Sequence, residues 1–256
     1  MKKIRFGTIH ADCLTFDEAI ERIVALARAR EGGYVVTPNV DHIVLAETHQ
    51  GLRDAYHDAA LALADGMPLL WMAKAMGHPL PEKISGSDLM MPLMRRAARE
   101  SLGVYLLGGM PGVADRAAKR LVGEIPQLAI VGTDAPELGF EKDEITLWQT
   151  IDKVREAKPD LVLVALGCPK QELFMRNYMR VLVPAVLIGV GASIDFIAGV
   201  QKRSPRWMST IGFEWLHRLA SDPRRLAHRY LIRDRAIGSI FVRMMRLPVS
   251  ERAFEG

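Results

Sequence analysis

The sequence predicts an α/β fold with a parallel sheet covered by helices on both faces, followed by a helical, basic C-terminal appendage. Short apolar segments alternate with helical patterns after residue 100, which is typical of parallel strands buried on both faces. Glycines follow three of these strand segments, at Gly108, Gly167 and Gly189. The last fifth of the chain is rich in arginine and has helical periodicity.

The first hundred residues show a less regular pattern. The segment 16–29 has apolar residues at helical spacing, and 61–64 is an apolar run broken by Asp65-Gly66. Pro38 ends a further strand at 34–37. The predicted elements are strands at 4–6, 34–37 and 61–64, and helices at 16–29, 42–57, 67–76 and 87–100.

The second half reads as successive strand–helix units. Its predicted strands are 104–107, 128–131, 161–166 and 186–189, and its helices are 111–122, 143–157, 171–176 and one beginning at 192. Two helices follow at 213–219 and 225–246, separated by Asp222-Pro223. We expect a catalytic core at 1–200, with halves meeting near residue 100, and an appendage at 201–256. Ligands of open parallel sheets bind beyond the carboxyl ends of the strands.

Composition excludes several classes of protein. With 256 residues and 49% hydrophobic residues, the chain can bury a core, so disorder is excluded as its main state. Its two cysteines, Cys13 and Cys168, exclude a disulfide scaffold and fit a reducing compartment. The longest apolar run has 14 residues, whereas a membrane span needs about 20. The first residues lack the apolar region of a signal peptide.

The basic charge is concentrated at the end of the chain. Residues 200–256 carry 12 Lys/Arg and 5 Asp/Glu, whereas the whole chain has a net charge of only +4. This excess favours an anionic partner, although a solvated helix face would look the same. The predicted helix 225–246 is amphipathic, which suits contact with an anionic membrane, self-association into a homo-oligomer, or docking on its own domain. Its apolar stripe consists of Leu226, Tyr230, Ile237, Phe241 and Met244.

Three strand ends carry groups suited to binding phosphates or sugar hydroxyls. Gly108-Gly109 precedes a helix, where backbone N–H groups can approach a phosphate, and Asp134 follows at the distance of a ribose-binding acid. A tight strand-to-helix turn would also use these glycines. Thr37 and Asn39 offer hydroxyl and amide groups for sugar hydroxyls, or a helix cap. After the strand at 161–166, Lys170 suits a phosphate and Gln171 suits a sugar or base.

Asp65 is the candidate for proton transfer. It follows a buried strand, so its carboxylate is expected at the carboxyl edge of the sheet, where it can act as a general base. Capping the next helix is an equally good use of an aspartate there. Asp41 and His42 do not have metal-ligand spacing, and no structural zinc site is expected.

In combination these motifs resemble the WecG/TagA/CpsF family of bacterial glycosyltransferases (glycosyltransferase family twenty-six). The similarity extends in order from about residue 34 to 231. The matching pieces are Thr37-Pro38-Asn39, Ala64-Asp65-Gly66-Met67-Pro68, Gly86-Ser87-Asp88-Leu89, Leu106-Leu107-Gly108-Gly109, Gly167 with Pro169-Lys170-Gln171-Glu172, Gly189-Val190-Gly191-Ala192, Pro205-Arg206-Trp207, Glu214-Trp215-Leu216 and Pro223-Arg224-Arg225.

The resemblance implies a Rossmann-like core and an inverting enzyme that needs no metal and no cofactor. Such enzymes move a sugar from a UDP-sugar to a polyprenyl-diphosphate-linked sugar in cell-surface polysaccharide biosynthesis. Their donors include N-acetylmannosamine, its uronic acid and glucose. It also implies a cytoplasmic protein that associates peripherally with the inner face of the plasma membrane through residues 201–256, and no nucleic acid partner.

The resemblance also assigns roles to residues. Asp65 falls at the position of the proposed catalytic base, and Thr37, Asn39 and Gln171 fall on pocket positions. Lys83 stands where the family commonly has arginine, which keeps the charge but loses the two-pronged guanidinium. Arg218, Arg225 and Arg229 are candidates for the leaving diphosphate. The competing interpretations are an NAD-dependent oxidoreductase acting on a nucleotide sugar, because of the glycine turn and Asp134, and a nucleic-acid-binding module, because of the basic tail.

Overall fold

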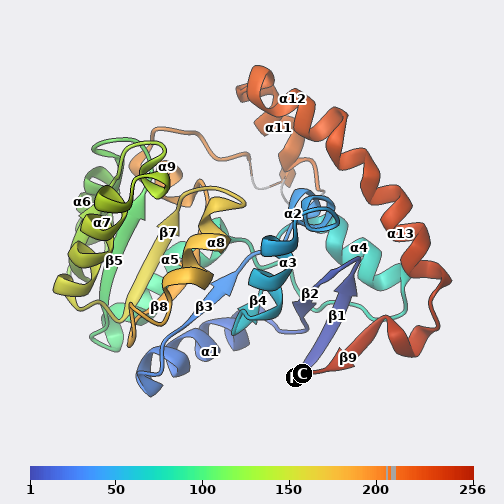
Figure 1. The fold of residues 1–256 in the computed structure, drawn as a ribbon, viewed down its shortest axis with the longest axis horizontal. Coiled ribbons are helices and arrows are strands. Elements are labelled where there is room, and N and C mark those ends of the chain that lie inside the picture. Colours follow the sequence, from blue (N-terminus) through green and yellow to red (C-terminus); the bar gives the residue numbers. More distant parts are fainter. Residues whose placement is uncertain (206, 209–211) are drawn as a thin grey trace. The chain divides into compact units, whose positions relative to one another are not determined.

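The computed structural model describes residues 1–205, 207–208 and 212–256, without the side chains of Arg218 and Arg225 (Figure 1). The chain forms two compact units, each built from separate stretches of sequence. Unit 1 comprises Met1–Phe16, Thr37–Ser85 and Arg203–Gly256, and unit 2 comprises Asp17–Val36 and Gly86–Lys202. The appendage therefore clusters with the beginning of the chain.

Unit 2 contains the parallel sheet that the alternating pattern predicts. Its neighbouring strands lie in the order β3-β8-β7-β5-β6, and they pair in parallel. Apart from the edge strand β6, these strands are almost entirely buried, which explains their continuous apolar sequences. The strands are β3 (Gly33–Val36), β5 (Gly103–Gly108), β6 (Ala129–Asp134), β7 (Leu161–Ala165) and β8 (Val186–Gly189).

Helices cover both faces of this sheet, as predicted (Figure 1). One layer runs through α1, α5, α9 and α6, because Arg96 of α5 binds Glu21 of α1 while α9 packs on both α5 and α6. In the other layer, Trp148 of α7 meets Tyr178 of α8. The helices are α1 (Phe16–Ala29), α5 (Gly86–Arg99), α6 (Val113–Glu124), η1 (Phe140–Lys142), α7 (Glu144–Ala157), α8 (Lys170–Tyr178) and α9 (Ser193–Ala198).

Unit 1 joins both ends of the chain. A small antiparallel sheet has the order β2-β1-β9, so the last strand pairs with the first. Its strands are β1 (Lys2–Phe6), β2 (Ile9–Asp12) and β9 (Ala253–Glu255), and β4 (Leu61–Ala62) also belongs to this unit. The helices are α2 (Val40–Ala46), α3 (Gln50–His57), α4 (Met67–Ala75), α11 (Glu214–Ser221), α12 (Pro223–Leu231), η2 (Arg233–Ala236), α13 (Ile237–Arg246) and η3 (Val249–Glu251).

Two predicted helices are each divided in the structure. The predicted helix 42–57 is α2 and α3, because His49 interrupts it and its Nδ1 accepts a hydrogen bond from Leu52 N–H as the N-cap of α3. The predicted helix 225–246 is α12, η2 and α13, because α12 ends at Leu231 and the 3₁₀ segment η2 separates it from α13. The prediction of one long tail helix was therefore wrong.

The apolar stripe of the tail packs on unit 1. Leu226 and Met244 are buried, and Tyr230, Ile237 and Phe241 are half-buried. Other apolar side chains of the appendage are exposed, among them Leu231, Ile232, Val242 and Met245. Of the described helices, none combines the length and the hydropathy that crossing a bilayer requires.

Candidate active site

The Thr37-Pro38-Asn39 loop of unit 1 leads into α2. Asn39 is the N-cap of this helix, and its Oδ1 accepts a hydrogen bond from His42 N–H at 3.3 Å. The cap that was one interpretation of this loop is therefore present, and it uses the oxygen of the amide. Thr37 is buried, with 6% of its surface exposed.

Two backbone hydrogen bonds bring three predicted segments of unit 1 together. Asp65 N–H donates to the Pro38 carbonyl at 2.8 Å, and Ile84 N–H donates to the Ala64 carbonyl at 2.8 Å. Asp65 thus lies beside the Thr37–Asn39 loop on one side and beside the segment carrying Lys83 on the other. Asp65 and Lys83 are both half-buried.

The N-cap position of α4 lies directly after Asp65. It is occupied by Gly66, with φ of 111°, which has no side chain with which to cap the helix. A positive φ at this position suits glycine, which turns the chain directly after Asp65. Asp65 itself is therefore not the N-cap residue of α4.

The glycine turn of unit 2 is shaped by close packing. Gly108 has φ of 112°, and a Cβ built there would lie 2.7 Å from the Ala165 carbonyl carbon on the neighbouring strand. Gly112, with φ of 76°, is the N-cap of α6 and makes no side-chain cap. The tight strand-to-helix turn is therefore real, and it presents the first N–H groups of α6 without a capping side chain.

Asp134 ends the edge strand β6, where it pairs in register with Leu107 of β5. Its Oδ1 binds Lys153 Nζ at 3.1 Å, while Oδ2 is buried without a hydrogen-bond partner in the described part of the chain. Burial and the nearby Asp134 charge raise the pKa of Tyr105. The carboxylate is held by α7, with one oxygen left unbonded.

Lys170 and Gln171 begin α8 in different environments. Lys170 Nζ lies 2.6 Å from Glu141 Oε1. Burial alone would raise the pKa of Glu141, but the hydrogen bond and charge of Lys170 outweigh it and lower the pKa. Gln171 is 2% exposed; its Oε1 accepts from Gly191 N–H at 3.1 Å and its Nε2 donates to Glu172 Oε1 at 3.0 Å. Gln171 therefore braces the turn after β8.

A charged cluster in unit 1 joins the appendage to α2. Arg229 Nε lies 3.2 Å from Asp41 Oδ2, and Arg233 Nη2 contacts Asp41 Oδ1. Asp234 Oδ2 lies 4.0 Å from Arg229 Nε. Burial and the Asp41 charge raise the pKa of Asp234 from 3.8 to about 6, against the opposing effect of the two arginines.

We predict that Asp234 makes stability depend on pH. The folded protein keeps this proton up to about pH 6 and the unfolded chain loses it near 3.8, so stability falls as pH rises between these values. With allowance for solvent screening, Asp234→Asn should match the wild type below about pH 3.8, where Asp234 is protonated in both the folded and the unfolded chain, and be more stable by about 1 kcal/mol at about pH 7.5. Urea unfolding of both proteins measures this difference, and identical pH profiles would contradict it.

The wild type has to be compared with Asp234→Asn, because His10 also changes the stability of the protein between about pH 4 and 6.5. Burial lowers its pKa to about 4, with a contribution from Lys3, so its neutral form is the stable one in the fold. Its contribution to stability is present above about pH 6.5 and is lost as pH falls towards 4, which is opposite to that of Asp234. His10 contributes equally to the free energy of unfolding of the wild type and of Asp234→Asn, so its contribution cancels in the difference between them.

Several members of these sites were missed from the sequence. Arg233 and Asp234 were not singled out, although the alternation Arg233-Asp234-Arg235 in a basic segment indicates a local ion-pair cluster. Glu141, the partner of Lys170, lies in the short helix η1, and the sequence there gives no indication of this contact. The side chains of the predicted Arg218 and Arg225, and residue Arg206, lie outside the described part of the structure.

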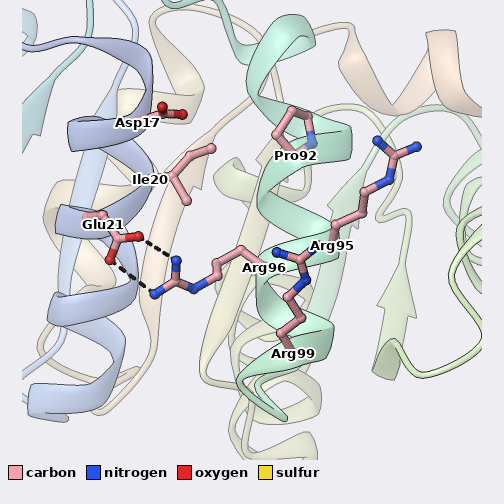
Figure 2. A pocket seen from close by; sticks show the side chains of 7 residues that line it. All are labelled: Asp17, Ile20, Glu21, Pro92, Arg95, Arg96 and Arg99. Carbon is pink, nitrogen blue, oxygen red and sulfur yellow. Dashed lines mark hydrogen bonds and ion pairs between the residues drawn. The ribbon is translucent and has the colours of Figure 1, made fainter.

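A pocket of about 370 Å³ lies elsewhere, between α1 and α5 of unit 2 (Figure 2). Arg96 spans it with Nη2 3.0 Å from Glu21 Oε2. None of the predicted site residues lines this pocket, whose walls are formed by Asp17, Ile20, Glu21, Pro92, Arg95, Arg96 and Arg99.

Comparison with known proteins agrees with the motifs. The family model described as "Glycosyl transferase WecG/TagA/CpsF family" matches residues 4–248. An N-acetylglucosaminyldiphosphoundecaprenol N-acetyl-beta-D-mannosaminyltransferase of Bacillus spizizenii is 30% identical over 195 residues, covering 76% of this chain and 74% of the relative. The protein of the same name from Bacillus subtilis is 30% identical over 194 residues, covering 76% and 73%.

The parallel α/β core and these matches define the chain as a glycosyltransferase. The match extends over nearly its whole length, including most of the appendage. The chain belongs to the WecG/TagA/CpsF family. The family resemblance of the sequence motifs is thereby confirmed.

Proposed function

We propose that this enzyme transfers N-acetylmannosamine from a UDP-sugar to N-acetylglucosamine linked through diphosphate to a polyprenyl lipid. Both Bacillus relatives are named for this donor sugar and acceptor, and each is matched over about three quarters of its length. The observation that carries the proposal is the position of Asp65, whose backbone is bonded to the Thr37–Asn39 loop and which is not the N-cap residue of α4.

The reaction is a single displacement. The acceptor hydroxyl oxygen bonds to the anomeric carbon, its proton passes to the Asp65 carboxylate, and the bond from that carbon to the UDP oxygen breaks with its electron pair. Attack from the side opposite to UDP inverts the anomeric configuration. Proton removal by a positioned base contributes about 10²- to 10⁴-fold to such rates.

The other predicted residues are assigned to the substrates. Thr37 and Asn39 bind the sugar hydroxyls, with the Asn39 amide N–H₂ as donor, because its oxygen caps α2. In unit 2, Gly108, Gly109 and Asp134 are assigned to the nucleotide. In unit 2, Lys170 is also assigned to a phosphate, and Gln171 supports the turn at Gly191. In unit 1, Lys83, Arg218, Arg225 and Arg229 are assigned to the diphosphate, for which they supply positive charge.

We further propose that the appendage binds the inner face of the plasma membrane peripherally. Its exposed Leu231, Ile232, Val242 and Met245 lie among arginines, a combination that suits the boundary of an anionic bilayer. Deleting residues 201–256 is a poor test of this role. It would remove β9 and the buried Leu226 and Met244, and so would disturb unit 1 itself.

Point substitutions test membrane binding without this damage. The double variant Leu231→Ser and Ile232→Ser should bind anionic vesicles about tenfold more weakly, because each exposed side chain contributes apolar area to the lipid boundary. Ile145→Ser, which removes an even more exposed isoleucine from α7, is the control and should bind as the wild type does. Vesicle flotation measures the bound fraction, and equal binding by all three proteins would contradict the proposal.

The activity itself is tested with full-length protein and a lipid-diphosphate-N-acetylglucosamine acceptor in anionic vesicles. UDP-linked N-acetylmannosamine, its uronic acid and glucose are supplied in turn, and lipid product is detected by mass spectrometry. Product from the N-acetylmannosamine donor alone is the expected result. Product from a different donor would correct the sugar, and NAD binding without any product would favour the oxidoreductase.

A further inference from the structure

Helix α2 is held by the appendage at both of its ends. At its first turn, Asp41 meets Arg229 and Arg233, which lie about 190 residues further along the chain. At its C-cap, both carboxylate oxygens of Glu47 lie 2.7 Å from Arg243 Nη2. The two contacts differ in burial, because Asp41 is 4% exposed whereas the Arg243 side chain is 53% exposed.

The buried contact holds Arg229 by charge on one side. Its Nε lies 3.2 Å from Asp41 Oδ2 in an ion pair that lacks hydrogen-bond geometry, and its guanidinium carbon lies 5.2 Å from the centre of the Tyr230 ring, which in turn packs on Trp215. Within the described residues, neither Nη group of Arg229 has a hydrogen-bond partner. A guanidinium held by an ion pair on one side and by an aromatic ring on its face keeps its two terminal donors available, which is the geometry that binds phosphate oxygens in pairs.

The same contacts relate Arg229 to the proposed base. Asp41 lies in the first turn of α2, whose N-cap is Asn39, and the Asp65 backbone is bonded to Pro38 of the same loop. All of these residues belong to unit 1. A displacement of Asp41 would therefore move Arg229 relative to the loop on which Asp65 rests.

We propose that Asp41 is a positioning residue, which holds Arg229 beside the Thr37–Asn39 loop with its outer edge directed to the substrate diphosphate. This inference rests on the proposed function, since it deepens the role given there to Arg229. The alternative is that Asp41 merely neutralises two arginines in a buried cluster. The two interpretations predict opposite changes in anion binding.

Binding of inorganic diphosphate, measured by calorimetry on the full-length protein, separates them. Asp41→Asn removes a negative charge beside two arginines, so neutralisation alone predicts tighter diphosphate binding. Positioning predicts the reverse, with affinity about tenfold weaker. Arg229→Gln should lose affinity to a similar extent. Glu47→Gln removes a charge from the other end of α2 without touching Arg229, and should stay within about twofold of wild type.

The outcomes decide between the two proposals separately. Weaker diphosphate binding by Asp41→Asn, with a slower transfer rate at saturating UDP-sugar, supports positioning. Unchanged or tighter binding overturns it, whatever the transfer assay gives. Absence of sugar transfer by the wild type would count against the proposed function, while the diphosphate measurements still test whether Asp41 fixes Arg229.

If Asp41→Asn does not fold, a second variant, Asp41→Glu, tests the same proposal. Asp41→Glu keeps the charge and moves the carboxylate outward by one methylene, so folding is expected. A shift of about 1 Å in a positioned group is enough to reduce rates considerably. We expect diphosphate affinity several-fold below wild type in this variant. Wild-type affinity and rate in Asp41→Glu would overturn the proposal in that case.

Discussion

Asp65→Asn is expected to lower the rate of sugar transfer by about 10²- to 10⁴-fold, because the amide cannot accept the proton of the attacking hydroxyl. The size and shape of the side chain are kept, and the backbone bond from Asp65 to Pro38 does not depend on the carboxylate. Affinity for the UDP-sugar and thermal stability should change little. Initial rates at saturating substrate, together with calorimetric binding of UDP, measure these quantities.

The matched control for Asp65→Asn is Asp152→Asn, an aspartate on α7 whose exposed side chain pairs with Arg155. Such surface pairs contribute little, so full activity is expected from it. Asp65→Asn with more than a tenth of wild-type activity would remove Asp65 from the role of base. A parallel loss of UDP binding would instead assign the residue to substrate binding.

Gly108→Ala should destabilise the protein by about 3 kcal/mol or more. Alanine is strained at φ of 112°, and its Cβ would lie 2.7 Å from the Ala165 carbonyl carbon, on a strand buried in the sheet. For a protein of this size, the melting temperature should fall by about 6–12 °C. Thermal unfolding followed by circular dichroism measures this change.

Gly123→Ala is the counterpart in the same unit. Gly123 lies near the end of α6, is exposed, and has no atom within 4 Å of a built Cβ. Because alanine favours the helix, this variant should be more stable by about 0.5–1 kcal/mol. Equal melting temperatures for the two variants would show that the Gly108 turn relaxes, and would weaken the interpretation of a rigid phosphate-facing loop.

The parallel half of the molecule could be predicted closely from its sequence. Strands buried on both faces are continuous apolar runs, and each is ended by a glycine or a helix cap, so local pattern and final structure coincide. The predicted range 186–189 is identical to β8, and Gly108 adopts the positive φ that its position suggested. Here each local preference agrees with the fold.

Unit 1 could not be predicted to the same extent, because its structure depends on partners distant in sequence. The three-residue strand β9 is too short for a pattern and exists through pairing with β1. The break after Ile232 accompanies the contact between Arg233 and Asp41. His49 caps α3 through a ring nitrogen, although histidine is not a preferred N-cap.

In the candidate site, too, local motifs could be predicted from the sequence, whereas contacts between distant residues could not. Motifs at strand ends indicated Asp65, Thr37 and Asn39, but only the structure shows that Gly66, and not Asp65, is the N-cap residue of α4. The pairing of Lys170 with Glu141 and of Arg229 with Asp41 could not be read from sequence, since neither pair is close along the chain. Long-range ion pairs leave no periodic trace in the sequence.

The pairing of β9 with β1 also orders the folding of the two units during translation. The two strands lie about 250 residues apart in the chain, and the ribosome adds about 5–20 residues per second, so β1 is made roughly 13–50 seconds before its partner. Unit 2 has all of its residues once Lys202 has been made, whereas unit 1 still lacks residues 203–256 at that point. The sheet-bearing half of the nascent enzyme is therefore synthesised well before the appendage that supplies the third strand of unit 1.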